Sequence, residues 1–348
     1  MTKPLALIGT LGQTVNLTEH TTLQAAEMAA MGRIAERNGY TAVAATTPPA
    51  RGARVPTGLA CWDGEAPIDL VWLHQQPPNF MGGPSPQVCT NIGLIARGLA
   101  TAKRVFRLVV DNNGTMRHKS VYGIKRRKEC DSFAVASDLI EKKVAEGAWT
   151  EAGIPECADP EAGLPFIYVP ITSEQLTLTK EVWGTKEEKT ADFGYIGTSR
   201  ANKKKQEARL ASLGDFLGHG NSLYSGSLFG KKCNFIKGWE QMSQVKAHLI
   251  VREPTMVQVP LHRYLQALVH GAVPVVLGEP EAVPFIHSDE LNTILRVSSL
   301  AEGLDLVARR EELLPLLRAE RDYWLDFDQS RAPDFSLLQS TNCTLNGL

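Results

Sequence analysis

The sequence lacks a strong excess of charge of either sign, a long hydrophobic run and any closely spaced pair of cysteines. Its 37 Lys and Arg residues nearly match its 38 Asp and Glu residues, so a nucleic-acid partner would have to bind a local basic patch. No apolar run is long enough to span a bilayer, and the apolar run after Met1 is too short for a secretory signal. We therefore expect a globular protein without a membrane partner.

The six cysteines are scattered along the chain and show no C-x-x-C spacing. This usage is typical of reduced thiols in the cytoplasm, and it predicts neither a disulfide framework nor a zinc site. The spacing of potential ligands elsewhere predicts no metal site either. Internal repeats and low-complexity tracts, which would indicate a solenoid or a disordered chain, are also missing.

Strand-like and helix-like patterns alternate through both halves of the chain. Short apolar runs at Leu5–Ile8, Ile68–Leu73 and Val105–Val110 are typical of buried parallel strands. After a polar stretch from Ser173 to Thr190, a second alternation begins at Asp192. At 348 residues the chain exceeds the roughly 250–300 residues at which a single core stops growing. The predicted fold class is α/β, with two Rossmann-like domains whose mostly parallel sheets face a central cleft.

We expect the first domain at residues 1–172 and the second at 173–318. A helix and tail at 319–348 would return to the first domain. The Pro-, Gly- and Arg-rich segment Thr46–Pro67 is expected to be an exposed loop, and Thr293–Val297 is expected to be a strand.

The segment from His262 to Phe285 predicts a helix, a tight turn and a buried strand. Its first part has apolar residues at helical spacing, and Gly271 suits the left-handed turn that ends a helix. Val273–Leu277 is apolar, as in a strand covered on both faces. This order is typical of the nucleotide-sugar half of two-domain glycosyltransferases, although an ordinary αβ unit would look the same. Arg263, near the helix start, is either a phosphate ligand or a partner of a surface glutamate.

Gly197 and Thr198 open a turn between a predicted strand and a helix. Backbone N–H groups and the helix dipole favour an anion at such a place. Arg200 and Lys204 are four residues apart, so they share one helix face. The turn therefore predicts a pyrophosphate clamp, with a solvated basic helix start as the alternative.

Asp111 directly follows the predicted strand Val105–Val110. In an open α/β sheet the carboxyl ends of strands face the crevice, where a carboxylate can take a proton from an attacking hydroxyl. A loop-capping aspartate is the alternative. Glu19, at the start of a predicted helix, is a weaker candidate because an acid there also favours the helix dipole.

A basic run that contains Tyr122 can bind the phosphates of a nucleic acid. Its alternative is a solvated charged face. The candidate DNA-binding residues are Arg117, Lys119, Lys125, Arg126, Arg127 and Lys128.

A collinear set of motifs makes the chain resemble the phage DNA β-glucosyltransferases. This family has the GT-B fold and moves glucose from UDP-glucose to 5-hydroxymethylcytosine in duplex DNA. The matching segments are TVNLTEHTT, PNFMGGPSP, RLVVDNNG, GYIGTSRANKKK and NFIKGW, followed by Arg263. The resemblance covers nearly the whole length, and the ordered set carries it because no single motif is diagnostic.

The resemblance implies a role for each matched residue. Asp111 would be the catalytic base, and Glu19 the active-site glutamate. Arg200, Lys204 and Arg263 would bind the donor phosphates. The full donor-binding set would be Gly197, Thr198, Arg200, Lys204, Ile236 near the uracil, Arg263, and Gln266 on the ribose.

Two positions depart from the family pattern. Gln266 stands where the family has a glutamate that grips the ribose, so the contact would be an uncharged hydrogen bond. Lys204 replaces an arginine, which removes a bidentate fork. These departures put the identity of the donor sugar and of the modified base in doubt more than the reaction type.

The resemblance implies an inverting glycosyltransferase that uses a UDP-sugar, UDP-glucose first, and duplex DNA with a flipped-out base. It also implies a divalent ion, Mg²⁺ or Mn²⁺, that assists product release, and a phage-encoded monomer in the host cytoplasm. Two other classes stay open on the residues alone. One is a glycosyltransferase with a small-molecule or protein acceptor, and the other is a noncatalytic protein that binds nucleotides or DNA.

Overall fold

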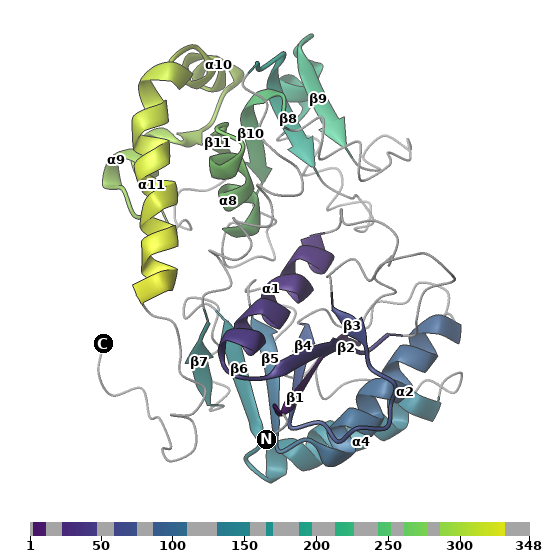
Figure 1. The fold of residues 1–348 in the computed structure, drawn as a ribbon. Coiled ribbons are helices and arrows are strands. Elements are labelled where there is room, and N and C mark those ends of the chain that lie inside the picture. Colours follow the sequence, from purple (N-terminus) through teal and green to yellow (C-terminus); the bar gives the residue numbers. More distant parts are fainter. Residues whose placement is uncertain are drawn as a thin grey trace. The chain divides into compact units, whose positions relative to one another are not determined.

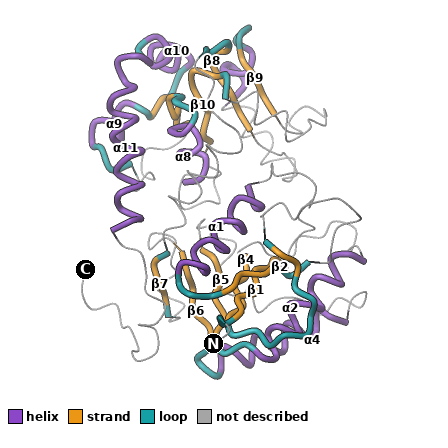
Figure 2. Tube along the Cα trace, viewed as in Figure 1, coloured by secondary structure: helices purple, strands orange, loops and turns teal. Residues whose placement is uncertain are grey.

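The computed structural model describes residues 3–11, 23–46, 59–74, 86–109, 131–153, 165–169, 188–196, 213–225, 243–251, 261–277 and 286–330. The chain divides into two compact units. One comprises Met1–Glu174 with Asp328–Leu348, and the other comprises Gln175–Phe327. Each unit contains one sheet with its own helices (Figures 1 and 2).

Seven described strands form the sheet of the first unit. They are β1 (Leu5–Thr10), β2 (Thr41–Ala44), β3 (Ala60–Cys61), β4 (Leu70–His74), β5 (Arg104–Val109), β6 (Trp149–Gly153) and β7 (Phe166–Tyr168). Their order is β3-β2-β1-β4-β5-β6-β7, and every neighbouring pair is parallel. The order reverses between β1 and β4, and ligands of such sheets bind outside the carboxyl ends of the strands at this switch point.

Helices cover both faces of this sheet. Helix α1 (Leu23–Arg37) packs on one face, while α2 (Pro86–Thr101) and α4 (Asp131–Ala145) pack on the other (Figure 1). The buried residues of α2 recur every three or four positions, which gives the helix one apolar face. Gly98 lets α2 approach β1 closely, because a Cβ there would lie 2.5 Å from Leu7 Cδ2.

Five described strands form the sheet of the second unit. They are β8 (Ala191–Ile196), β9 (Ser222–Ser225), β10 (Val245–Val251), β11 (Val273–Leu277) and β12 (Arg296–Val297). Their order is β12-β11-β10-β8-β9, again with every pair parallel, so the switch point lies between β8 and β10. The predicted α/β class with mostly parallel sheets is confirmed.

The helices of the second unit connect and cover these strands. They include α8 (Leu261–Val269), α9 (Asp289–Ile294), α10 (Leu300–Ala308) and α11 (Arg310–Ser330). The predicted helix, turn and buried strand after His262 are confirmed as α8 and β11. Gly271, with φ of 60°, makes the left-handed turn between them. None of the described helices is both long and apolar enough to cross a membrane.

Two predictions of secondary structure are wrong in part. The expected loop Thr46–Pro67 contains the short strand β3, which pairs with β2 at its carboxyl end. The expected strand Thr293–Val297 begins as the last turn of α9, and only Arg296 and Val297 are extended. A polar cap at Ser288 starts that helix, and this signal outweighs the β-branched residues that favoured a strand.

Candidate functional site

Helix α8 carries the two predicted donor-binding residues that fall within the described structure. Arg263 lies near its amino end and is half-buried, and Gln266 follows three residues later on the same side. The helix connects β10 to β11, so its amino end follows the carboxyl edge of the second sheet. The structure therefore places both residues on one side of the helix that follows β10 in the chain.

Gln266 has a buried side-chain amide with an unusual environment. The residue is 3% exposed, and neither its Oε1 nor its Nε2 has a hydrogen-bond partner among the described residues. A buried amide without a partner costs about 1–3 kcal/mol. Such groups are few in native proteins, and each calls for a reason such as a bound ligand. The site thus contains a polar group that a ligand hydroxyl could satisfy.

Tyr264 anchors α8 on the side of α11. Its ring is fully buried, and both burial and the nearby Glu320 carboxylate raise the pKa of its hydroxyl. Glu320 in turn accepts hydrogen bonds from the backbone N–H groups of His287 and Ser288, at 2.8 and 3.0 Å. These contacts hold the helix that carries Arg263 and Gln266 against the rest of its unit.

The remaining predicted site residues lie outside the described residues, although described elements lead directly to several of them. Strand β8 ends one residue before Gly197, and β5 ends two residues before Asp111. Helix α1 begins four residues after Glu19. The predicted residues in question are Glu19, Asp111, Gly197, Thr198, Arg200, Lys204, Ile236, and the basic set Arg117, Lys119, Lys125, Arg126, Arg127 and Lys128.

A buried pair at the switch point of the first sheet escaped the sequence analysis. His74 is the last residue of β4 and lies beside Thr10 at the end of β1. Its Nε2 contacts Glu27 Oε2 of α1, and both side chains are only 4% exposed. A histidine held by a carboxylate can hold or transfer a proton. The signal in the sequence is a histidine that ends an otherwise apolar strand, VWLH, and it gives no indication of its partner.

A second buried pair lies on the opposite face of the same sheet. Arg107 Nη1 of β5 donates to Glu151 Oε1 of β6 at 3.1 Å, and the side chains are 7% and 5% exposed. The two residues are direct neighbours in the parallel register. Since β5 leads to Asp111, this pair fixes the strand that precedes the predicted base.

No group of three or more His, Cys, Asp or Glu residues that could hold a metal ion occurs in the part of the chain that the structure describes. Cys61 and Cys89, the cysteines that lie in the described part, are free thiols.

Comparison with solved structures reveals likeness in fold to one DNA-modifying enzyme. A mutant of T4 phage β-glucosyltransferase in complex with UDP-glucose superimposes with a TM-score of 0.60 and 16% sequence identity, over 94% of this chain and 99% of that chain. The T4 phage enzyme with UDP and Mn²⁺ gives a TM-score of 0.54 and 15% identity over the same shares of both chains. No known protein-family model matches the sequence, and no curated protein matches it.

At this identity the likeness establishes the fold and nothing finer. The chain has the fold of T4 phage β-glucosyltransferase, of the GT-B class with two Rossmann-like units, and this confirms the predicted α/β class with mostly parallel sheets.

Proposed function

We propose that this protein is an inverting glycosyltransferase that modifies phage duplex DNA. It would move glucose or a related sugar from a UDP-sugar to the hydroxymethyl group of a modified pyrimidine, with 5-hydroxymethylcytosine as the first candidate. The observation that carries this proposal is the likeness in fold to T4 phage β-glucosyltransferase over 94% of the chain. The structures with UDP-glucose and with UDP and Mn²⁺ are of that enzyme, and they suggest the class of donor.

The donor would bind at the switch point of the second sheet. Arg200, Lys204 and Arg263 would hold the two phosphates, with Gly197 and Thr198 supplying backbone N–H groups. Ile236 would lie against the uracil. The buried amide of Gln266, which has no partner among the described residues, would hydrogen-bond the ribose hydroxyls.

The reaction would be a direct displacement at the anomeric carbon of the sugar. Asp111 would take the proton of the hydroxymethyl group, and the oxygen would form a bond to that carbon as the bond to the UDP oxygen breaks. The leaving UDP gains negative charge, which the cationic groups of the donor site would stabilise. Attack from the face opposite the leaving group inverts the configuration of the carbon. Glu19, just before α1, would help to orient the acceptor.

Duplex DNA would reach this centre only after the target nucleotide leaves the base stack. The basic run from Arg117 to Lys128 would bind the flanking phosphates, which gives binding that weakens with salt. Mg²⁺ or Mn²⁺ would assist release of UDP. No group of three or more His, Cys, Asp or Glu residues within the described ranges would hold this ion. The protein would act as a monomer in the cytoplasm of the infected host.

The test separates donor binding from transfer. Asp111→Asn should bind UDP-glucose as the wild type does, yet release no UDP when hydroxymethylated duplex DNA is added. Arg263→Ala should weaken UDP binding by roughly 1.5–3 kcal/mol, the range for a hydrogen bond to a charged group. If Asp111→Asn kept full activity, Asp111 would not be the catalytic base.

Substitutions in the basic run from Arg117 to Lys128 test whether DNA is the acceptor. Replacement of Lys125, Arg126 and Arg127 by glutamine should lower the rate on DNA and reduce its dependence on salt, because fewer counterions are released. An unchanged rate and salt dependence would favour a small-molecule or protein acceptor.

A further inference from the structure

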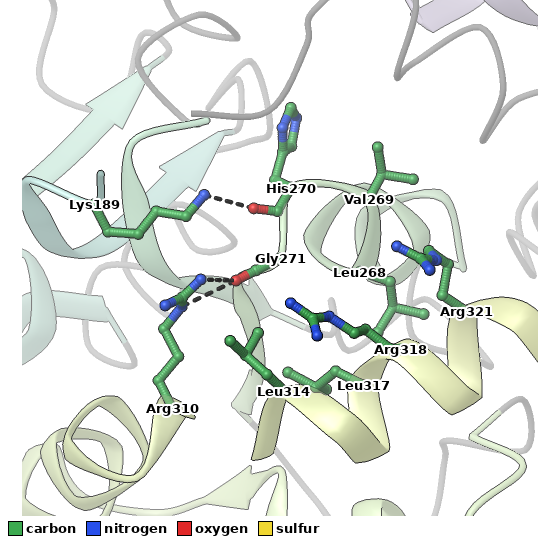
Figure 3. Close-up of a pocket in the computed structure, with 10 residues that line it drawn as sticks. All are labelled: Lys189, Leu268, Val269, His270, Gly271, Arg310, Leu314, Leu317, Arg318 and Arg321. Carbon is green, nitrogen blue, oxygen red and sulfur yellow. Dashed lines mark hydrogen bonds between the residues drawn. The ribbon is translucent and has the colours of Figure 1, made fainter. Parts of the chain in front are cut away.

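A basic cavity lies at the amino edge of the second sheet, at the far end of the strands from the proposed donor site. It is lined by Lys189, which precedes β8, by the turn at Gly271 that precedes β11, and by one face of α11 (Figure 3). Because the strands are parallel and β8 has six residues, about 20 Å of strand separates this edge from the carboxyl edge.

Apart from His270, every ionisable side chain that lines the cavity is a lysine or an arginine. The basic residues are Lys189, Arg310, Arg318 and Arg321. The three arginines recur at helical spacing on α11, so they share one face. Leu268 and Leu317 supply an apolar wall beside them (Figure 3). Such a concentration of like charge around a cavity favours the binding of an anion.

Two of these cations hold the end of α8. Lys189 Nζ donates to the backbone oxygens of Ser243 and His270, at 2.7 and 2.5 Å. Arg310 donates to the carbonyl oxygen of Gly271 from Nη2 at 2.7 Å and from Nε at 3.0 Å, and it also pairs with Glu311. Cations at the carboxyl end of a helix are favourable, so these two residues have a structural role already.

The other two cations are not needed for that role. Arg321 pairs with its sequence neighbour Asp322, through Nε and Nη2. Arg318 makes no ion pair or hydrogen bond with any residue that the structure describes. A guanidinium has five N–H donors, so both arginines retain donors for a further acceptor.

The pKa of Lys189 also reflects the lack of a negatively charged side chain in the cavity lining. Burial and the nearby Arg310 lower the pKa of Lys189 to about 8. No aspartate or glutamate lines the cavity to oppose this effect. An anion beside the ammonium would raise this pKa again.

We propose that this cavity is a second anion site, separate from the donor site, which binds a single phosphate or pyrophosphate group through Arg318, Arg321 and Lys189. Its volume of about 230 Å³ is below the roughly 300–1,000 Å³ of sites for drug-sized ligands, so a whole nucleotide is too large. The phosphate is either free or part of a nucleic-acid backbone. The site stands independently of the proposed function, because its residues and the argument for it lie outside the donor site.

Occupancy would affect the donor site through α8. The carbonyl groups that Lys189 and Arg310 hold belong to the turn at the end of the same helix that carries Arg263 and Gln266. An anion that keeps Lys189 charged would strengthen its bond to His270 and stabilise the helix.

Titration calorimetry with inorganic phosphate and with pyrophosphate, at constant ionic strength set by chloride, tests the site. We expect saturable binding to the wild type, and at least about tenfold weaker binding to Arg318→Gln/Arg321→Gln, because charged hydrogen bonds are lost. Arg309→Gln is the matched control, since Arg309 lies next to this face but pairs with Asp305 and Glu312. Thermal denaturation confirms that each variant folds.

A second variant separates this site from the donor site. Phosphate that binds in the cavity should still bind to Arg263→Ala. Phosphate that binds at the donor site would instead be lost in Arg263→Ala and kept in Arg318→Gln/Arg321→Gln. A short DNA duplex identifies the source: if the double variant weakens duplex binding, the phosphate belongs to the backbone, and otherwise it is free. Equal affinities of the wild type and the double variant, or no saturable binding, would overturn the proposal.

Discussion

Gln266 is the residue at which sequence and structure say the most about function. The sequence shows only an amide where the resembling family has a glutamate. The structure adds that the amide is buried and has no partner among the described residues. A folded protein keeps such a group at a cost, which is typical of a residue retained for binding and not for stability.

Gln266→Leu should therefore separate stability from binding. Leucine has a similar size and removes the orphan amide, so the free energy of unfolding without ligand should rise by about 1–3 kcal/mol. UDP-sugar affinity should fall at least about tenfold as a ribose hydrogen bond is lost. Urea denaturation and calorimetry measure the two effects. A less stable variant with unchanged UDP-sugar affinity would assign the amide a structural role.

At the scale of single elements, α8 is held at its middle and at its carboxyl end by groups of different kinds. Its middle is fixed by the buried Tyr264, and its carboxyl end by the ammonium of Lys189 and the guanidinium of Arg310. The turn at Gly271 after this helix could be predicted from the sequence, because it requires a left-handed backbone conformation that glycine adopts readily. Lys189 and Arg310 could not, since they lie 81 and 39 residues from their acceptors.

Lys189 should leave a signature in the pH dependence of stability. Its pKa is about 8 in the folded protein, below the ordinary value of 10.5, so the folded state binds fewer protons than the unfolded chain between these values. The stability of the wild type should therefore rise from pH 8 to pH 10.5 relative to Lys189→Met, which cannot titrate. Urea denaturation of both proteins across this range gives the difference, and a constant difference would contradict a lowered pKa.

The pair Arg107–Glu151 should behave as a buried ion pair within the first sheet. Arg107→Met alone should lower the free energy of unfolding by about 3–5 kcal/mol, because it removes the guanidinium that pairs with the buried Glu151 carboxylate. The double variant Arg107→Met/Glu151→Leu should recover most of this loss. If the two single effects simply add in the double variant, the pair is not coupled.

At the scale of the whole molecule, the alternation of apolar runs and helical periodicity was enough to predict two units with parallel sheets. Two elements were missed. β3 has two residues, and α10 was not expected although the capping box of Ser299 and Glu302 marks its start. The pair of His74 and Glu27 could not be predicted, since it depends on how α1 lies against β4. The catalytic assignments rest on motif order and stay predictions.

The central claim, sugar transfer to a modified base in DNA, is tested most directly by the mass of the product. The protein would be incubated with duplex DNA that contains 5-hydroxymethylcytosine and with each of several UDP-sugars. The DNA would then be digested to nucleosides for mass spectrometry. We predict that the modified nucleoside gains the mass of one sugar residue with the wild type and not with Asp111→Asn. No mass gain with any UDP-sugar on any hydroxymethylated pyrimidine would contradict the account.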